Sequence, residues 1–185
     1  MKKIIIVVII SLSFSSYSQE KKFKDWKADE IEKYKSLKAL AKYIENKEAN
    51  QISKDTLFNK YIYFDYVLND TLVERRERRL ESFDTIFSAF RKPIDSLGIE
   101  NIDAKPIRFF KNHKIYEPFK EELAKETIGG EKMYTKDANV FAYYKKNEPE
   151  KPLKALLFDP DTNKLVAWIM INQGGYRYFL TFNLF

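Results

Sequence analysis

Apolar residues recur every three or four positions through the first half of the chain, with charged residues between them. The first such stretch carries six of these residues: Phe23, Trp26, Tyr34, Leu37, Ala41 and Ile44. This spacing predicts an amphipathic helix of about twenty residues. A second helix is predicted from Asp55 to Leu68, although the nearly continuous aromatic run from Tyr61 to Leu68 is also compatible with a strand.

The clearest helical pattern lies between Thr71 and Gly98. Its apolar residues step by three and four: Leu80, Phe83, Phe87, Phe90, Ile94 and Leu97. Thr71 and Glu74 have the spacing of a capping box, in which both side chains accept hydrogen bonds from free backbone amides at the helix start. Gly98 suits a left-handed position after the last turn. Pro93 has no amide hydrogen to donate, so it predicts a kink or a split within this helix.

The second half of the chain has a different composition. All five glycines and five of the six prolines lie at or after Gly98, which is typical of turns between strands. We predict a loop over Ile99–Pro106 and a short apolar strand or extended segment over Ile107–Phe110. A short helix is predicted from Glu117 to about Glu126, because proline follows at its first turn.

Short apolar and alternating runs in the remaining residues predict an antiparallel meander. Its strands are expected at Met133–Thr135, Val140–Lys145, Leu153–Phe158, Leu165–Ile171 and Tyr176–Leu184. Helices that precede a terminal sheet indicate an α+β fold. The predicted architecture is a set of N-terminal helices packed on a C-terminal antiparallel β-meander of three to five strands.

Met1–Ser18 has the three parts of an export signal peptide. Two lysines precede a short apolar run, and Ser16 and Ser18 fit a small-x-small cleavage site ahead of Gln19. The run is shorter than the roughly 20 apolar residues that a transmembrane helix needs. We therefore expect cleavage, a single domain over residues 19–185, no stable membrane span, and a periplasmic or extracellular location.

Composition narrows the chemistry of the mature chain. The two leader lysines leave 31 of the 33 basic residues against 27 acidic ones, a net charge of +4 over 167 residues. Hydrophobic residues at 44% supply enough apolar area for a core. The chain has no cysteine and one histidine, so disulfides, thiol nucleophiles and multi-histidine metal sites are excluded within one chain. We expect no cofactor and no bound metal.

The sequence contains few candidates for catalysis. His113 could act as a general base, and Glu117 and Glu121 could supply paired carboxylates for glycan hydrolysis. A histidine between lysines is more typical of a surface loop, and acidic residues are common in a first helical turn because they favour the helix dipole. No nucleophile elbow, zinc motif or phosphate-binding glycine loop is present. The pattern favours a non-enzymatic role.

Two groups of residues are candidates for a binding surface. Extending the three-and-four spacing backwards from Leu80 places Arg76 on the apolar face of its helix, where a guanidinium needs a carboxylate, a carbonyl or a ligand. A partly exposed aromatic patch is predicted from four tyrosines: Tyr143, Tyr144, Tyr176 and Tyr178. The glutamates between the arginines of residues 74–79 argue against nucleic-acid binding.

An export signal and a full core without an assembled catalytic set favour an exported binding module. Such a module would act by surface complementarity on a protein or a cell-envelope polymer, as an inhibitor, an immunity-type protein or an accessory factor does. Two alternatives stay open. One is an envelope hydrolase that uses the carboxylates around Glu117, and the other is a structural subunit of an envelope complex with an exposed apolar patch.

Overall fold

The α+β architecture predicted from the sequence is confirmed. The structure is a computed structural model. It describes residues 22–119, 125–128, 131–134, 137–173 and 176–181. Helices occupy the chain from residue 28 to residue 97, and an antiparallel sheet follows them. The predicted signal peptide, Met1–Ser18, lies outside the described residues.

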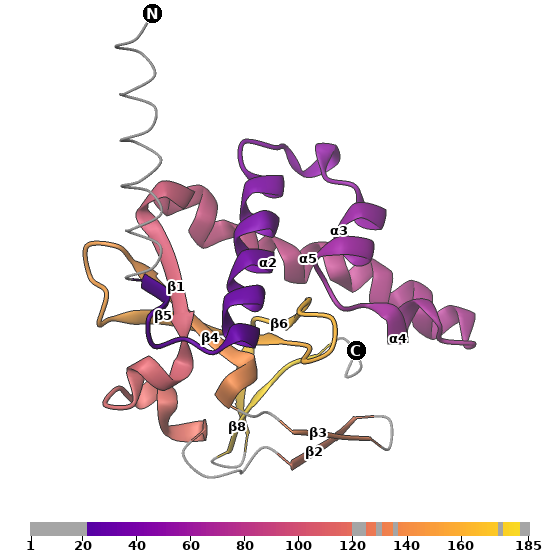
Figure 1. Ribbon diagram of the computed structural model, residues 1–185. Helices are drawn as coiled ribbons and strands as arrows, with labels where there is room; N and C mark the ends of the chain where they lie inside the picture. Colours follow the sequence, from indigo (N-terminus) through magenta and orange to yellow (C-terminus); the bar gives the residue numbers. More distant parts are fainter. Residues whose placement is uncertain (1–21, 120–124, 129–130, 135–136, 174–175, 182–185) are drawn as a thin grey trace, which may run out of the picture.

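Residues 28–97 contain four α-helices (Figure 1). They and a short 3-10 helix have these bounds: α2 Ala28–Ile44, η1 Ala49–Gln51, α3 Lys54–Lys60, α4 Asp65–Leu68 and α5 Val73–Leu97. The apolar spacing correctly placed α2 and α5, because both bury one stripe of residues. Within the described residues, each helix is too short or too charged to be a transmembrane segment.

The predicted single helix from Asp55 to Leu68 is wrong. It is divided into α3 and α4 by an extended stretch in which Ile62 pairs in parallel with Leu165. The backbone amide of Tyr63 donates to the carbonyl of Leu165 at 2.9 Å. The edge of a sheet has unpaired backbone groups, and this aromatic stretch satisfies them at the expense of about one helical turn. The strand alternative was therefore partly correct.

The start of α5 differs from the prediction, whereas its end agrees with it. Thr71 is not the N-terminal cap; α5 begins at Val73, and the Asp70 carboxylate accepts from the Leu72 amide at 3.0 Å instead. The predicted split at Pro93 is absent, and α5 continues through it as one helix. Gly98 ends the helix with a φ of 76°, a value that few other residues adopt without strain.

The four-stranded antiparallel sheet has the order β1-β4-β5-β6. The strands are β1 Ile102–Pro106, β4 Val140–Lys145, β5 Pro152–Phe158 and β6 Leu165–Ala167. The bounds of β4 are those predicted. The predicted loop over Ile99–Pro106 is wrong, because it contains η2 Ile99–Asn101 and the edge strand β1. Burial alternates along β1, so that Ile102, Ala104 and Pro106 are buried and the two residues between them are half-buried.

Two hairpins and three further 3-10 helices complete the described chain. The hairpins pair β2 Lys125–Ile128 with β3 Glu131–Tyr134, and β7 Met170–Gln173 with β8 Tyr176–Phe179. The 3-10 helices are η3 Ile107–Phe110, η4 Lys114–Phe119 and η5 Asp137–Asn139. Three of the predicted elements are wrong. In each, the chain changes direction within the predicted segment, and a short apolar run in the sequence does not reveal such a change. The extended segment Ile107–Phe110 is helical, the helix to Glu126 gives way to β2, and Leu165–Ile171 is divided into β6 and β7.

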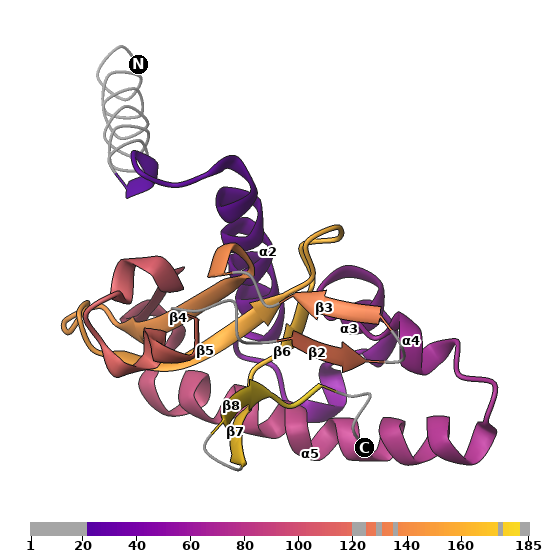
Figure 2. The same cartoon turned by 90° about the horizontal axis from the view of Figure 1, so that it is seen from below.

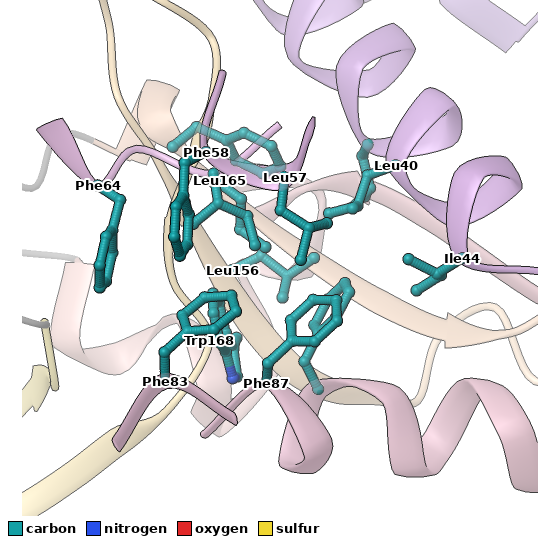
Figure 3. Close-up of a cluster of buried hydrophobic side chains, with 14 of the residues drawn as sticks. Leu40, Ile44, Leu57, Phe58, Phe64, Phe83, Phe87, Leu156, Leu165 and Trp168 are labelled. Carbon is teal, nitrogen blue, oxygen red and sulfur yellow. The ribbon is translucent and has the colours of Figure 1, made fainter. Parts of the chain in front are cut away.

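Buried side chains lie on both faces of the sheet. On one face, residues of α2, α3 and α5 pack against β4, β5 and β6. Figure 3 shows Leu57 of α3 and Phe83 and Phe87 of α5 pointing toward one another in this layer. On the other face, η3, η4 and the β7–β8 hairpin cover the sheet with Phe110, Phe179 and their neighbours (Figure 2). The helical layer extends past the sheet at the start of α5 (Figures 1 and 2).

Candidate functional site

Two of the three residues proposed for catalysis, His113 and Glu117, lie within the described residues. His113 lies in a turn between η3 and η4, where its Nδ1 accepts from the backbone amide of Ile115 at 3.1 Å. Glu117 is exposed. Neither residue lines any of the three cavities that are described below. Glu121 lies outside the described residues. In the part of the chain that is described, His113 therefore acts as a local turn residue.

The four candidate tyrosines do not meet as one exposed patch. Neighbouring residues of a strand point to opposite faces of the sheet, so Tyr143 faces the helices and Tyr144 packs against Phe110 on the other side. Tyr144 is buried, which contradicts the predicted exposure. Burial raises the pKa of both hydroxyls to about 12. Tyr176 and Tyr178 pair with β7 through their backbones, and their side chains lie outside the described residues.

The arginine that is buried is Arg79 and not Arg76. Arg79 Nη1 donates to the buried Asp70 carboxylate at 2.9 Å, and Arg75 Nη2 donates to it at 2.6 Å. Hydrogen bonding from Arg75 lowers the pKa of Asp70 to about 2. Arg76 is half-buried and forms no ion pair with the described residues. Val73, which shared the predicted face, is 50% exposed, so the backward extension of the apolar spacing is wrong.

Arg76 lies next to an apolar turn at the far end of the helical layer. Within the described residues, three of the four exposed large hydrophobic side chains are in this turn: Leu68, Leu72 and Val73. The bonds from Arg75 and Arg79 to Asp70 fix the turn, because Asp70 also accepts from the Leu72 amide. The turn is therefore held in one conformation although it buries little apolar area.

A second polar cluster anchors the first described residues to the sheet. Lys22 Nζ lies 2.6 Å from both the Tyr34 hydroxyl and Asp103 Oδ2, and the Tyr34 hydroxyl donates to Asp103 Oδ1 at 2.8 Å. Burial raises the pKa of Tyr34 and lowers that of Lys22. Burial also opposes ionisation of Asp103, but its bonds from Lys22 and Tyr34 outweigh this and lower its pKa. Every member has a partner, which favours a structural role.

A buried ion pair fixes the start of α2 to η3. Glu30 is completely buried, and its carboxylate accepts from Arg108 Nε at 2.7 Å and from Arg108 Nη2 at 2.8 Å. It also accepts from the Lys27 amide at 2.7 Å. A carboxylate that accepts three such bonds is well satisfied, and its complete burial keeps it out of reach of a ligand. This pair is structural as well.

The largest of the three cavities is a groove of about 540 Å³ along one flank of α5. We call it the α5 groove. One wall is a polar stripe of α5, and the other wall is formed by residues of η1 and of α3, which lies next to α5 in Figure 1. The lining residues are Ala49, Asn50, Ile52, Lys54, Leu57, Phe83, Asp84, Phe87, Ser88, Arg91 and Asp95. Its volume lies within the range of roughly 300–1,000 Å³ that is typical of ligand sites.

The positions of these residues follow from helix geometry. Phe83 and Phe87 belong to the buried stripe of α5 and form the apolar floor together with Leu57. The polar residues of the α5 wall are one position further along at each turn: Asp84, Ser88, Arg91 and Asp95. A step of one residue turns the side chain by about 100°, so this stripe lies on the flank, at the border between core and solvent.

Hydrogen bonds hold the two walls at a fixed distance. Lys54 Nζ of α3 donates to Asp84 Oδ2 of α5 at 2.8 Å, and Arg91 Nη2 donates to the backbone carbonyl of Lys47 at 2.7 Å. The Ser53 amide donates to the hydroxyl of Tyr43 at 3.1 Å, which ties the same wall to α2. These bonds link the segments that line the groove.

Arg91 is the polar residue of the groove with the most unused bonding capacity. Its side chain is only 15% exposed, and its Nε is buried without a hydrogen-bond partner among the described residues. The nearest carboxylate, Asp95 Oδ1, lies 3.4 Å from Nη2. A buried donor without an acceptor costs free energy, which an acceptor brought by a ligand would recover. One signal of this site is visible in the sequence, namely the polar stripe beside the apolar stripe of α5.

The other two cavities are weaker candidates. A cavity of about 50 Å³ lies between Leu37, Phe90 and Tyr143, and it has room for little more than one or two water molecules. A cavity of about 310 Å³ lies near Trp168 and Arg177 on the far side of β5. Arg177 is exposed, so that cavity offers no buried polar group without a partner.

No family model, no curated protein and no solved structure matches this chain. Function is therefore inferred from the geometry of the α5 groove and from the sequence. Among the described residues, no group of three His, Cys, Asp or Glu side chains is arranged to hold a metal ion. The groove offers shape, apolar surface and one guanidinium, which together are suited to binding.

Proposed function

We propose that this protein is an exported binding module whose α5 groove receives a segment of a partner protein or of an envelope polymer. The observation that supports this most directly is the groove itself. It has an apolar floor of Leu57, Phe83 and Phe87, and polar side chains of α5 form one of its walls. Sites of this kind bury most of a ligand and use a few polar groups to orient it. The export signal predicted in residues 1–18 supports a periplasmic or extracellular partner.

The lining of the groove favours binding over hydrolysis. It contains no histidine, and its two carboxylates, Asp84 and Asp95, are eleven residues apart on one helix. At 1.5 Å per residue they are separated by about 16 Å along the helix axis. Paired-carboxylate glycosidases keep their two groups within roughly 5–9.5 Å. Asp84 is in addition engaged by Lys54, which leaves it unsuited to act as an acid or a base.

The proposal is tested by filling the groove. Ser88 is exposed on the α5 wall, so Ser88→Trp should occupy the space above Phe87 without disturbing the core. Ser96 is exposed on the same helix outside the groove, which makes Ser96→Trp a matched control. Affinity capture from envelope extracts is expected to recover the same partner with the mature protein and with Ser96→Trp, and to lose it with Ser88→Trp. Equal recovery with all three proteins would contradict the proposal.

A further inference from the structure

We infer that this protein has a second binding site, which takes a single apolar chain that ends in one carboxylate, as a free fatty acid does. The site is the cavity of about 310 Å³ between β5, η4 and the β7–β8 hairpin, and we call it the hairpin cavity. None of the residues that line it also lines the α5 groove. The two sites are therefore independent, and each can fail without the other.

The hairpin cavity follows from the short pairing between β5 and β6. β6 pairs with β5 only at its end, through Leu157 and Phe158. After Ala167 the chain leaves the sheet and forms the β7–β8 hairpin, whose strands pair with each other and not with β5 (Figures 1 and 2). The first residues of β5 and the residues of β7 consequently line the same cavity instead of pairing as neighbouring strands.

The lining of the hairpin cavity is positively charged. Lys154 of β5 and Arg177 of β8 are both exposed, and no Asp or Glu is among the described residues that line the cavity. Neither cation forms an ion pair within the described part of the chain. Asn172 is paired directly opposite Arg177, so the two side chains are neighbours on one face of the hairpin. A carboxylate in the cavity therefore meets accessible donors from β5 and from the hairpin.

The rest of the lining suits an apolar chain. Leu153 is 40% exposed, and Ile169, Met170 and Ile171 are half-buried. Apart from the two cations, Asn172 is the single polar side chain of the lining among the described residues. A peptide would bring a backbone donor and acceptor with each residue, and these groups need partners that an acyl chain does not need. The volume lies near the lower end of ligand sites, so one chain fits better than the two chains of a phospholipid.

Trp168 provides a direct measurement of binding, because it lines the hairpin cavity and the chain has only two tryptophans. Its Nε1 donates to the Ile86 carbonyl at 2.9 Å, which fixes the indole. Trp26→Phe leaves Trp168 as the only indole, and bromine quenches indole fluorescence only at short range. We expect 11-bromoundecanoate, below its micelle concentration, to quench Trp168. The neutral 11-bromo-1-undecanol has the same chain and should bind about ten-fold more weakly, because it lacks the contacts with the two cations.

Variants of the two cations test the charge of the site. Lys154→Gln combined with Arg177→Gln should weaken the carboxylate probe about ten-fold and change the alcohol less than about two-fold. Lys42→Gln combined with Lys92→Gln removes two exposed charges outside the cavity, and this control should change neither probe. Raising the salt from about 50 to about 500 mM NaCl should weaken the carboxylate probe and not the alcohol.

A matched pair of leucines tests the apolar part. Leu153→Ser should weaken both probes alike, by about three-fold, because it removes apolar surface from the lining. Leu68 is also 40% exposed but lies outside the cavity, so Leu68→Ser should change neither probe. The same titrations on the chain with both indoles should give the same affinities with a smaller amplitude, which guards against a Trp26→Phe variant that does not fold.

Three results would overturn the inference. If neither probe quenches Trp168, the hairpin cavity is not a binding site. If the acid and the alcohol bind equally and the double variant changes neither, the cations do not select a carboxylate. If vesicles of brominated phosphatidylglycerol quench Trp168 as strongly as the free acid does, the protein binds a membrane surface and not a single chain. The α5 groove is tested separately, by capture with Ser88→Trp, and none of these results decides that test.

Discussion

The two faces of the central sheet are covered in different ways. On one face, α-helices and the segments between them bring rings together: the centroids of Phe58 and Phe64 are 4.3 Å apart, and those of Phe87 and Trp168 are 6.3 Å apart. On the other face, short 3-10 helices and a hairpin supply the ring contacts, with Phe110 and Tyr144 at 6.1 Å and Phe119 and Phe179 at 6.1 Å. A helix satisfies its own backbone, so it can cover a sheet and still leave one flank free.

This difference explains why the α5 groove lies in the helical layer. The backbone of α5 needs no further hydrogen-bond partner on its flank. Residues of η1 and α3 can therefore lie beside α5 and leave the α5 groove between them. The covering of the opposite face consists of turns whose backbone groups need local partners, as the bond from the Ile115 amide to His113 shows.

The largest difference is expected between two phenylalanines. Phe87 is buried among Phe83, Phe90 and Trp168, and Phe87→Ala should lower the free energy of unfolding by about 3–5 kcal/mol. Phe119 of η4 is half-buried on the other face, and Phe119→Ala should cost less than about 2 kcal/mol. Urea unfolding of both variants at neutral pH measures this. Equal losses would mean that the two layers contribute alike.

The same contrast separates what the sequence could predict from what it could not. The three-and-four spacing through Phe83, Phe87 and Phe90 predicted α5 and its buried face, because a helix that covers a sheet repeats one environment at every turn. On the other face, Ile107–Phe110 has no repeated environment, and the short apolar run was compatible with either state. The helical arrangement of that run depends on contacts with distant residues.

The α5 groove could not be predicted from the sequence, although the residues of one of its walls follow a visible pattern. The polar stripe of Asp84, Ser88, Arg91 and Asp95 is visible in the sequence, but the same pattern is typical of an ordinary solvated flank. Only the position of η1 and α3 makes it the wall of a groove. Arg79 was missed because the spacing was extended from Leu80, one residue away from the buried positions 79, 83 and 87.

The next largest effect is expected where the helical layer extends past the sheet. Without strands beneath it, the start of α5 depends on the bonds from Arg75 and Arg79 to Asp70. The pKa of Asp70 is about 2 in the folded protein, below the roughly 4 of an unfolded chain. The unfolded state therefore binds more protons between these values, so this stability is present above about pH 4 and is lost as the pH falls to about 2.

Asp70→Asn should consequently destabilise the protein at pH 7 and reduce its sensitivity to acid between about pH 4 and pH 2. Urea unfolding at several pH values in this range measures both effects. Asp84→Asn is the control, because the Lys54–Asp84 pair is exposed and surface pairs contribute little. If the two variants show the same pH dependence, the Asp70 cluster does not hold the end of the helical layer.

The smallest effect concerns the wall of the groove that α3 supplies. Ser53 caps α3, since its Oγ accepts from the Thr56 amide at 3.2 Å. Ser53→Ala should remove about 1 kcal/mol of stability, and the Thr56 amide should exchange its hydrogen faster because it has lost its acceptor. Ser96→Ala is the control: Ser96 lies within the last turns of α5 and caps no helix, so this change should alter neither the stability nor the exchange at Thr56.

The loss at Ser53 should stay local, because Leu57 and Phe58 still anchor α3 in the core. Unchanged exchange at Thr56 would show that contacts with the helical layer, and not the cap, fix this wall, and the groove would then depend on the same aromatic packing as the sheet.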